Sequence, residues 1–465
     1  EKPATPFRRD LRSWQVGYRA EDAYFLIHPK SSPMNQSRRT FLKQGGLLAG
    51  GLIAAPALLA RSAPSDTIRV GLIGCRNMGF GDLSNCLQQE NVICGGLCDV
   101  DEEVLMRRAK DIEETYGIKP PLYRDFRKML EDPELDAVVI GTPDHWHCLI
   151  TIMACEAGKA VYVEKPLANS IAECQAMVSA VRHHGSIVQV GQQQRSGQHW
   201  QDVAAYVQSG KLGQIRRVMV WGNFAYGKGN PRIPNEAVPK NLDYNLWLGP
   251  SAHIPYNPNR LHGAWRHTWA FGGGLLSDWG VHLLDIVLWT MKSPVPKRVS
   301  AFGGIYQYPN NLIETPDTLD VTWDMGTYNL TWSHVAGNEL KQFGRTYGIA
   351  FMGADGVLVV NRQGWEVQAP NGAESDLLKP FEVGKDSNHL AHAADFIQAM
   401  RENRDPICNI EAGRDAAVLA QYGIVALRSG QTLTMGDDPY DLSHQPDAQA
   451  FAKPTYHSGW TFPHW

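Results

Sequence analysis

Two short stretches of the sequence combine residue types that can move a proton. In "GGGLLSDWGVHLLD", Asp278 and His282 are four residues apart, so on a helix they share a face, and Asp285 follows three residues later. A carboxylate and an imidazole placed in this way can bind and deprotonate a sugar hydroxyl. They could equally bind a metal ion or form a satisfied polar seam, and the spacing alone does not separate these alternatives.

The second stretch is "EKP", Glu164–Lys165–Pro166, which ends a predicted strand. A buried lysine can have a lowered pKa and exchange a proton with a hydroxyl or carbonyl group. A single lysine is more often a surface charge, so its setting in the fold must decide its role. In "TPDHWH", His145 and His147 would point the same way on a strand, which suits a metal ion, but only Asp144 lies near them, and we expect no metal site.

A glycine-rich turn lies nearer the start of the chain, in "RVGLIGCRNMGFGD", residues 69–82. A buried strand that runs into such a turn and then into a helix holds the pyrophosphate of a dinucleotide in many proteins. Gly74 and Gly79 fit the first and third glycines of the G-x-G-x-x-G pattern, but Arg76 stands where the second should be. Its backbone can still approach a pyrophosphate if the side chain points outward, and its guanidinium group could bind a phosphate.

Asp99 supports the same interpretation, because it lies 20 residues after Gly79 at the end of the second predicted strand. A carboxylate there binds the ribose hydroxyls and repels a 2′-phosphate, so we expect NAD rather than NADP. The alternative is that Asp99 caps the helix that starts at "DVDEE".

The elements that must position these residues alternate between apolar strands and helix-length segments up to about residue 191. This order predicts a parallel sheet covered by helices on both faces, with ligands at the carboxyl ends of its strands. The loops that hold Gly74–Gly79, Asp99, Thr142–His147 and Glu164–Pro166 all follow such ends. The helix "DEEVLMRRAKDIEETYG" should end at Gly117.

After about residue 192 the pattern changes to strands with turn residues between them, interrupted by the helix around Asp278 and followed by helices near the end. The fold class is therefore α/β, with a Rossmann domain followed by an α+β domain built on an open, mainly antiparallel sheet. The expected segments are a non-native or disordered leader (1–33), a signal and linker (34–65), the Rossmann domain (66–191), a substrate-binding and oligomerisation domain (192–440) and a tail (441–465).

Composition narrows the class of protein. The chain is 43% hydrophobic and 20% charged with a net charge of -4, which gives no sign of a nucleic-acid partner. Its eight cysteines include no C-x-x-C pair and are expected to be buried thiols. We expect most of the 14 Trp and 16 Tyr to be core residues rather than sugar-stacking groups.

The segment "SRRTFLKQGGLLAGGLIAAPALLARSA" joins two arginines to an apolar run that is short for a membrane span of roughly 20 residues. It resembles a twin-arginine export signal, with a membrane anchor or a buried helix as the alternatives. We therefore expect a periplasmic or exported bacterial protein that uses the twin-arginine machinery, tethered to the membrane if the signal stays uncleaved.

The ordered set "GLIGCRNMG", "CDVD", "GTPDHWH", "AGKAVYVEKPLA" and "GGGLLSDWGVHLLDI" resembles the Gfo/Idh/MocA family over roughly residues 66–430. The resemblance implies an NAD(P)-dependent oxidoreductase that forms dimers or tetramers. It places the general base on His282, the group that positions and polarises the reacting oxygen on Lys165, and a substrate-binding carboxylate on Asp278. The residues expected at the cofactor are Gly74, Arg76, Asn77, Met78, Gly79, Asp99, Thr142, Pro143, His147, Glu164 and Lys165.

The expected function is hydride transfer between NAD and a CH–OH group of a sugar, polyol or glycoside. The first alternative is a glycoside hydrolase or lyase that oxidises C3 transiently with a tightly bound NAD. That alternative suits an exported enzyme, which has no obvious soluble NAD pool. The second alternative is a sugar-binding protein without catalysis, which the presence of Lys165 and His282 disfavours.

Overall fold

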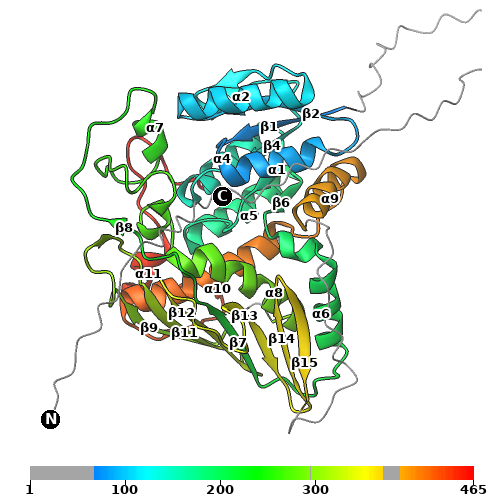
Figure 1. Ribbon diagram of the computed structural model, residues 1–465, viewed down its shortest axis with the longest axis vertical. Helices are drawn as coiled ribbons and strands as arrows, with labels where there is room; N and C mark the ends of the chain where they lie inside the picture. The colour runs from blue at the N-terminus through cyan, green and yellow to red at the C-terminus, as the bar shows by residue number, and fades with distance from the viewer. Residues whose placement is uncertain (1–66, 294, 370–387) are drawn as a thin grey trace, which may run out of the picture. The chain divides into compact units, whose positions relative to one another are not determined.

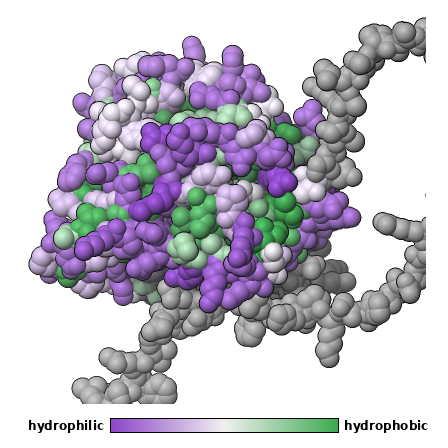
Figure 2. All heavy atoms as spheres, turned by 90° about the horizontal axis from the view of Figure 1, so that it is seen from above, coloured by the Kyte–Doolittle hydropathy of each residue, from purple (hydrophilic) through white to green (hydrophobic). Residues whose placement is uncertain are grey.

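The computed structural model describes residues 67–293, 295–369 and 388–465. The expected leader (1–33) and the expected signal and linker (34–65) lie outside the described residues. Within these ranges, none of the helices is both long enough and apolar enough to cross a membrane. The face drawn in Figure 2 is mainly hydrophilic, with hydrophobic residues gathered only in small groups.

Residues 68–190 form a six-stranded sheet with the order β3-β2-β1-β4-β5-β6. Every neighbouring pair in it is parallel. This strand order is that of a dinucleotide-binding Rossmann fold, so the predicted fold of this region is confirmed. The strands are β1 (Ile68–Ile73), β2 (Val92–Cys98), β3 (Leu122–Tyr123), β4 (Ala137–Ile140), β5 (Ala160–Val163) and β6 (Val188–Val190).

Helices cover both faces of this sheet, as the alternation of strands and helices predicts (Figure 1). Alternate residues of β4 enter two different cores, with Val138 and Ile140 in one and Ala137 and Val139 in the other. The helices are α1 (Asn77–Leu87), α2 (Glu102–Tyr116), α3 (Phe126–Leu130), α4 (His147–Glu156) and α5 (Ile171–His184). Helix α2 ends at Gly117, whose φ of 69° suits glycine, as expected.

The second sheet has eight strands in the order β15-β14-β13-β7-β12-β11-β9-β16. Only β7 and β12 pair in parallel, so the predicted, mainly antiparallel sheet is confirmed. Burial alternates along β11 and β12, which means that one face is covered and the other is open. The strands are β7 (Arg217–Gly222), β9 (Arg298–Gly304), β11 (Thr318–Asp324), β12 (Asn329–Val335), β13 (Tyr347–Met352), β14 (Val357–Asn361), β15 (Gly364–Gln368) and β16 (Leu433–Thr434), with a separate pair β8 (Asn230–Pro231) and β10 (Asn311–Leu312).

The covered face of the second sheet carries α8 and α10, which lie between it and the first sheet in Figure 1. The indole of Trp323 on β11 donates a hydrogen bond to the Leu419 carbonyl of α10 over 3.1 Å. Helix α9 follows seven of the eight strands of the second sheet in sequence, yet its Phe396 and Ile397 enter a core of the first sheet. The remaining helices are α6 (Gln198–Gln208), α7 (Tyr244–Leu248), α8 (Val281–Met291), α9 (Asn388–Glu402), α10 (Ile410–Ser429) and α11 (Pro446–Ala452).

The cysteines and several of the tryptophans that were expected in the core are buried. All eight cysteines are buried free thiols. Trp200, Trp221, Trp323 and Trp332 are fully buried, so these aromatic residues are core residues.

A buried ion pair joins the end of the first sheet to α8. The guanidinium group of Arg195 donates to both carboxylate oxygens of Asp285 over 2.7–3.0 Å, and the Asp285 side chain is 0% exposed. Asp285 is therefore a structural partner of Arg195, rather than a third polar group beside Asp278 and His282.

We predict that Asp285→Asn destabilises the protein by roughly 3–5 kcal/mol, because it leaves the Arg195 charge buried without its counter-ion. Urea denaturation followed by tryptophan fluorescence measures the change. The matched control is Asp324→Asn, which breaks the exposed pair with Arg298 and should leave the midpoint unchanged. Equal midpoints for the two variants would contradict the structural role of Arg195–Asp285.

Candidate active site

Three glycines interlock where β1, α1 and β4 meet. Gly74 has a φ of 88°, and a Cβ there would lie 2.8 Å from the Gly141 carbonyl. A Cβ on Gly79 would lie 2.5 Å from the Gly74 oxygen, and one on Gly141 would lie 2.5 Å from the Gly79 Cα. Side chains at these three positions would clash with the backbone, so only glycine fits. The resulting turn, called the glycine cradle here, lets the backbone approach a pyrophosphate closely.

The missing second glycine has a conformational explanation. Arg76 is the N-cap of α1 with φ -84° and ψ 170°, an extended conformation that any residue can adopt. Asn77 and Met78 follow in the first turn of α1 and are exposed beside the cradle. The N–H groups of this turn are the anion-binding end of the helix. Gly141, which the sequence analysis missed, supplies the third close contact from another strand.

Asp99 is tied to the same turn. Its Oδ2 accepts a hydrogen bond from the Cys75 N–H over 2.7 Å, and its Oδ1 accepts one from the Asp101 N–H over 2.9 Å. The interpretation of Asp99 as the cap of α2 is wrong, because the carboxylate of Asp101 accepts from Glu103 and Val104 at that helix start. A carboxylate has about four lone-pair sites, so Asp99 keeps acceptor capacity for a ribose hydroxyl.

Arg108 of α2 is a further contact to the turn that sequence reasoning missed. Its Nε donates to the Cys75 carbonyl over 3.2 Å, and its guanidinium group lies 4.1 Å from the centre of the Phe80 ring. One arginine in a charged amphipathic helix carries no distinguishing signal in the sequence.

His147 joins two of the predicted loops. Its Nδ1 is 2.8 Å from the Pro166 carbonyl oxygen and its Nε2 is 3.0 Å from the Thr142 carbonyl oxygen. Burial lowers the pKa of His147 to about 4, so the ring is neutral near neutral pH. A neutral imidazole has one N–H, so His147 donates to only one of these two carbonyls, and its ring lies between the Thr142–Pro143 loop and the loop that carries Lys165. The Thr142 hydroxyl is buried and has no hydrogen-bond partner in the described part of the chain. It is therefore available to bind a polar group of a ligand.

His145 and His147 are not on a strand, contrary to the assumption made from sequence. They lie in the 3₁₀ turn η1 (Asp144–Trp146) and at the start of α4, and His145 Nε2 faces the Trp247 carbonyl oxygen instead.

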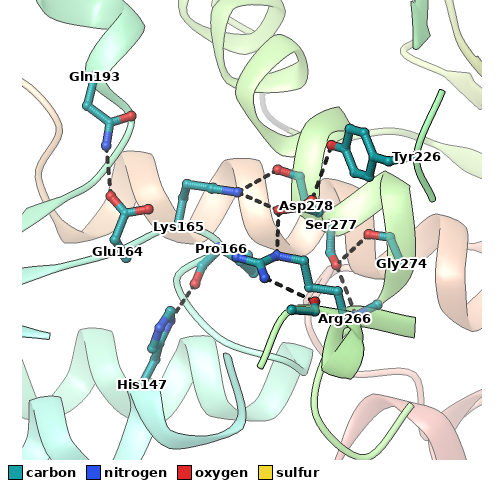
Figure 3. Close-up of polar contacts among 12 residues, drawn as sticks. His147, Glu164, Lys165, Pro166, Gln193, Tyr226, Arg266, Gly274, Ser277 and Asp278 are labelled. Carbon is teal, nitrogen blue, oxygen red and sulfur yellow. Dashed lines mark hydrogen bonds and ion pairs between the residues drawn. The ribbon is translucent and has the colours of Figure 1, made fainter. Parts of the chain in front are cut away.

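Lys165, Asp278 and Arg266 form the centre of the site (Figure 3). The Lys165 ammonium group donates to the Asp278 carboxylate over 2.8 Å and to its carbonyl over 2.7 Å. Arg266 Nε donates to the same carboxylate oxygen over 3.1 Å, and the Tyr226 hydroxyl lies 3.4 Å from the other one. Burial would raise the pKa of Asp278, but Lys165 and Arg266 outweigh it and hold that pKa well below its usual range. Asp278 is therefore an ionised carboxylate that holds two cations.

Lys165 is not a surface charge, since its side chain is 11% exposed. An ammonium group has three N–H donors, and Asp278 takes two of them. The third has no hydrogen-bond partner among the residues that the structure describes, so it can donate to an oxygen of a bound molecule.

His282 lies one turn beyond Asp278, and the chain between them is irregular. Leu276–Gly280 form a π-helical turn, a distortion that often marks functional sites, before α8 begins at Val281. Burial, reinforced by the charges of Lys165 and Arg362, lowers the pKa of His282 well below its usual value. The ring is therefore neutral, and its buried Nδ1 has no hydrogen-bond partner among the residues that the structure describes.

Glu164 points into the interior. Its carboxyl group accepts a hydrogen bond from Gln193 over 2.7 Å, and burial raises its pKa to about 7. The neighbouring Asp82 carboxyl, on α1, also has its pKa raised by burial and then by Glu164. A contact between Glu164 and the cofactor stays a prediction, as do the cofactor contacts of Thr142, Pro143 and His147.

Besides Arg108, sequence reasoning missed three side chains, Tyr226, Arg266 and Arg362, and it gave Asp144 no role in the site. Asp144 is buried, and burial raises its pKa to about 8 against the attraction of Arg266 and Lys165. Arg266 lies in "AWRHTW", just before the three glycines, and its proximity to that motif was the only available signal.

The raised pKa of Asp144 predicts how the stability of the protein depends on pH. Its carboxyl is protonated in the folded protein up to about pH 8, but in the unfolded chain it ionises above the ordinary pKa of 3.8. The folded state then binds the extra proton, so the free energy of unfolding falls between about pH 4 and about pH 8, by up to ~1.4 kcal/mol per pH unit. Asp144→Asn removes this titration and should lose less stability over that window in urea denaturation. Parallel pH profiles for variant and wild type would contradict the raised pKa.

Comparison with known proteins agrees with this geometry. Residues 68–192 match the family model described as "Oxidoreductase family, NAD-binding Rossmann fold", residues 197–303 match "Oxidoreductase family, C-terminal alpha/beta domain", and residues 251–358 match "GFO/IDH/MocA C-terminal domain".

A "Glycosyl hydrolase family 109 protein" of Shewanella baltica is 31% identical over 167 residues, which is 31% of this chain and 36% of the relative. The chain thus spans about a third of the length of that curated relative.

Two solved structures share the fold. The aldose-aldose oxidoreductase of Caulobacter crescentus, complexed with glycerol, has a TM-score of 0.61 and 20% identity over 79% of this chain and 100% of that chain. The WlbA dehydrogenase of Bordetella pertussis, in complex with NADH and UDP-GlcNAcA, has a TM-score of 0.60 and 21% identity over 80% of this chain and 100% of that chain. With its glycine cradle, its strand order and these matches, the chain carries the NAD-binding Rossmann domain and the C-terminal domain of the Gfo/Idh/MocA oxidoreductase family.

Proposed function

We propose that the protein oxidises a CH–OH group of a sugar, polyol or glycoside with NAD as the hydride acceptor. The observation that carries this proposal is the position of Lys165, bound to an ionised Asp278 and within electrostatic reach of a neutral His282. A lysine donor, a carboxylate and an unprotonated imidazole are together the groups that oxidation of an alcohol needs.

Each group has a separate task. Lys165 donates its remaining N–H to the substrate oxygen and stabilises negative charge as it develops there. His282 accepts the hydroxyl proton, which its neutral ring allows. Asp278 holds Lys165 and Arg266 in place and can accept a hydrogen bond from a neighbouring hydroxyl. When bound, NAD would supply the hydride acceptor for the C–H hydride, and His282 would take the O–H proton.

The cofactor would be held by the Gly74–Gly79 turn, the N–H groups that start α1, and Asp99. The cradle leaves no room for a Cβ at Gly74 or Gly79, which fits a dinucleotide backbone contact. Asn77 and Met78 would flank the pyrophosphate and Arg76 would face it. The Thr142–Pro143 loop, which lies against the His147 ring, would border the nicotinamide side.

A second candidate is a glycoside hydrolase in which oxidation is transient and NAD stays bound. The similarity to a glycosyl hydrolase family 109 protein favours it. We also propose export by the twin-arginine route and assembly into a homo-oligomer, on the basis of the sequence alone.

One experiment separates the two candidates. The protein is purified without added nucleotide, denatured, and any released dinucleotide is identified by mass. The intact protein is then given a panel of sugars, polyols and glycosides. NADH formation supports the dehydrogenase, whereas retained NAD with released free sugar and no net NADH supports the hydrolase. No product from either assay would overturn both.

We predict that Lys165→Met lowers turnover by about 10³-fold, because it removes the donor on the reacting oxygen. Its affinity for NAD should change little, because the glycine turn and Asp99 are intact. Steady-state kinetics and calorimetric NAD titration measure the two effects. Lys128→Met, which alters an exposed lysine paired with Glu131, serves as the control. An active Lys165→Met variant would remove Lys165 from the mechanism.

Asp99→Asn should weaken NAD binding about 10- to 100-fold, the range for losing a charged hydrogen-bond partner. NADP binding should be unchanged or improved, because the repulsion of the 2′-phosphate is gone. Titration of both nucleotides gives the ratio. Asp101→Asn is the control, since this residue caps α2 and should affect stability without changing the ratio. Equal losses for NAD and NADP would show that Asp99 only braces the turn.

A further inference from the structure

One cation of the site has no counter-ion in the described part of the chain. Arg362 lies between β14 and β15, and its Nε donates to the Gln194 side-chain oxygen over 2.9 Å. Its guanidinium group lies 4.5 Å from the centre of the Trp279 ring. No carboxylate of the described residues forms an ion pair with it. The remaining guanidinium N–H groups are therefore held in place without an anion.

Arg362 is positioned beside the reacting groups. Trp279 directly follows Asp278, and its ring contacts the His282 ring with centres 5.9 Å apart. Gln194, which binds Arg362, also donates to the His282 carbonyl over 3.1 Å. The same glutamine thus orients the arginine relative to the proposed base.

The charges of the site are unbalanced. Lys165 and Arg266 share the single carboxylate of Asp278, and Arg362 adds a third positive charge. The other nearby carboxyls, Asp144 and Glu164, offset only part of this positive charge near neutral pH. Burial raises the pKa of Asp144 to about 8 and that of Glu164 to about 7. Burial also lowers the pKa of Arg362, and the attraction of the surrounding groups does not make up for it.

A group of aromatic rings lies next to Arg362. Phe224, Tyr347 and Trp279 pack together with ring centres 4.6–5.6 Å apart, and Tyr226 adjoins them with 39% of its surface exposed. Aromatic faces bind the apolar faces of sugars, while a guanidinium group matches a carboxylate bidentately.

We propose that Arg362 is a specificity-determining residue that binds the carboxylate of an acidic sugar, so that the substrate class is uronic acids or their glycosides. This inference rests on the proposed function for the identity of the site. It adds the charge of the substrate, which the reacting groups themselves do not specify.

The test uses the full chain loaded with NAD and matched probes: methyl glycosides of glucose and galactose, the corresponding glucuronides and galacturonides, and the methyl esters of those uronides. Equilibrium binding is measured by calorimetry, and turnover by NADH formation and release of free sugar. The wild type should bind at least one uronide more than about tenfold tighter than its uncharged ester, as a charge-assisted pair implies.

Arg362→Met should remove this preference while binding the neutral ester as before, and Arg362→Lys should keep part of it. Both variants are checked for an unchanged thermal midpoint, and Arg362→Lys provides the answer if Arg362→Met fails to fold. Arg428→Met is the control, since Arg428 also stacks on an aromatic ring, that of Phe451, but is not among the residues that contact Asp278, Gln194 or Trp279.

Three outcomes would overturn the proposal: equal binding of uronide and ester, equal losses for both probes in Arg362→Met, or weaker NAD binding in that variant. NADH formation from neutral sugars without preference for uronides would overturn the inference and leave the proposed function standing. Arg362-dependent uronide binding with neither NADH nor free sugar formed would support the inference and overturn the proposed function.

Discussion

The ionised carboxylate of Asp278, enclosed by two cations, is the interaction on which the site depends. Lys165 comes from the loop after β5 of the first sheet, whereas Arg266 comes from the segment that precedes α8. A single carboxylate thus sets the relative positions of side chains from two structural layers. Taking a carboxylate out of water is costly unless it is paired and hydrogen-bonded, and here both cations and the Tyr226 hydroxyl meet that requirement.

The short turn η2 (Gln193–Ser196) supports this arrangement from the other side. Three consecutive residues bind the segments around them: Gln193 binds Glu164, Gln194 binds the His282 carbonyl and Arg362, and Arg195 binds Asp285. The segment directly follows β6, where the first sheet ends. Because α8 is fixed at both His282 and Asp285, its reacting face has little freedom relative to the first sheet. Such rigidity keeps a donor and a base in register with a substrate.

Burial and charge act together on the chemistry. Desolvation keeps His282 neutral and Asp144 protonated, so the site offers a proton acceptor and a proton reservoir within one cluster. Asp278 stays ionised against the same desolvation, because Lys165 and Arg266 hold its pKa well below its usual range. A cluster of this kind favours a substrate that brings negative charge, or that develops it on an oxygen during reaction.

The sequence by itself determined the fold class and named most of the polar groups that lie in the candidate site. The alternation of buried strands with capped helices predicts the parallel sheet. Gly74, Gly79, Lys165 and His282 lie at the ends of strands or helices. These are local signals, because strand periodicity and turn chemistry are set by neighbouring residues.

Only the tertiary structure decided which polar groups meet. In the structure Asp101 caps α2, whereas Asp99 binds the glycine turn. Asp285 pairs with Arg195 and therefore lies outside the candidate site. The tertiary structure also brought in Arg362, which lies 80 residues beyond His282 in the sequence and carries no motif. Pairing of charges and loss of water depend on distances between remote segments, and the order of residues along the chain does not fix those distances.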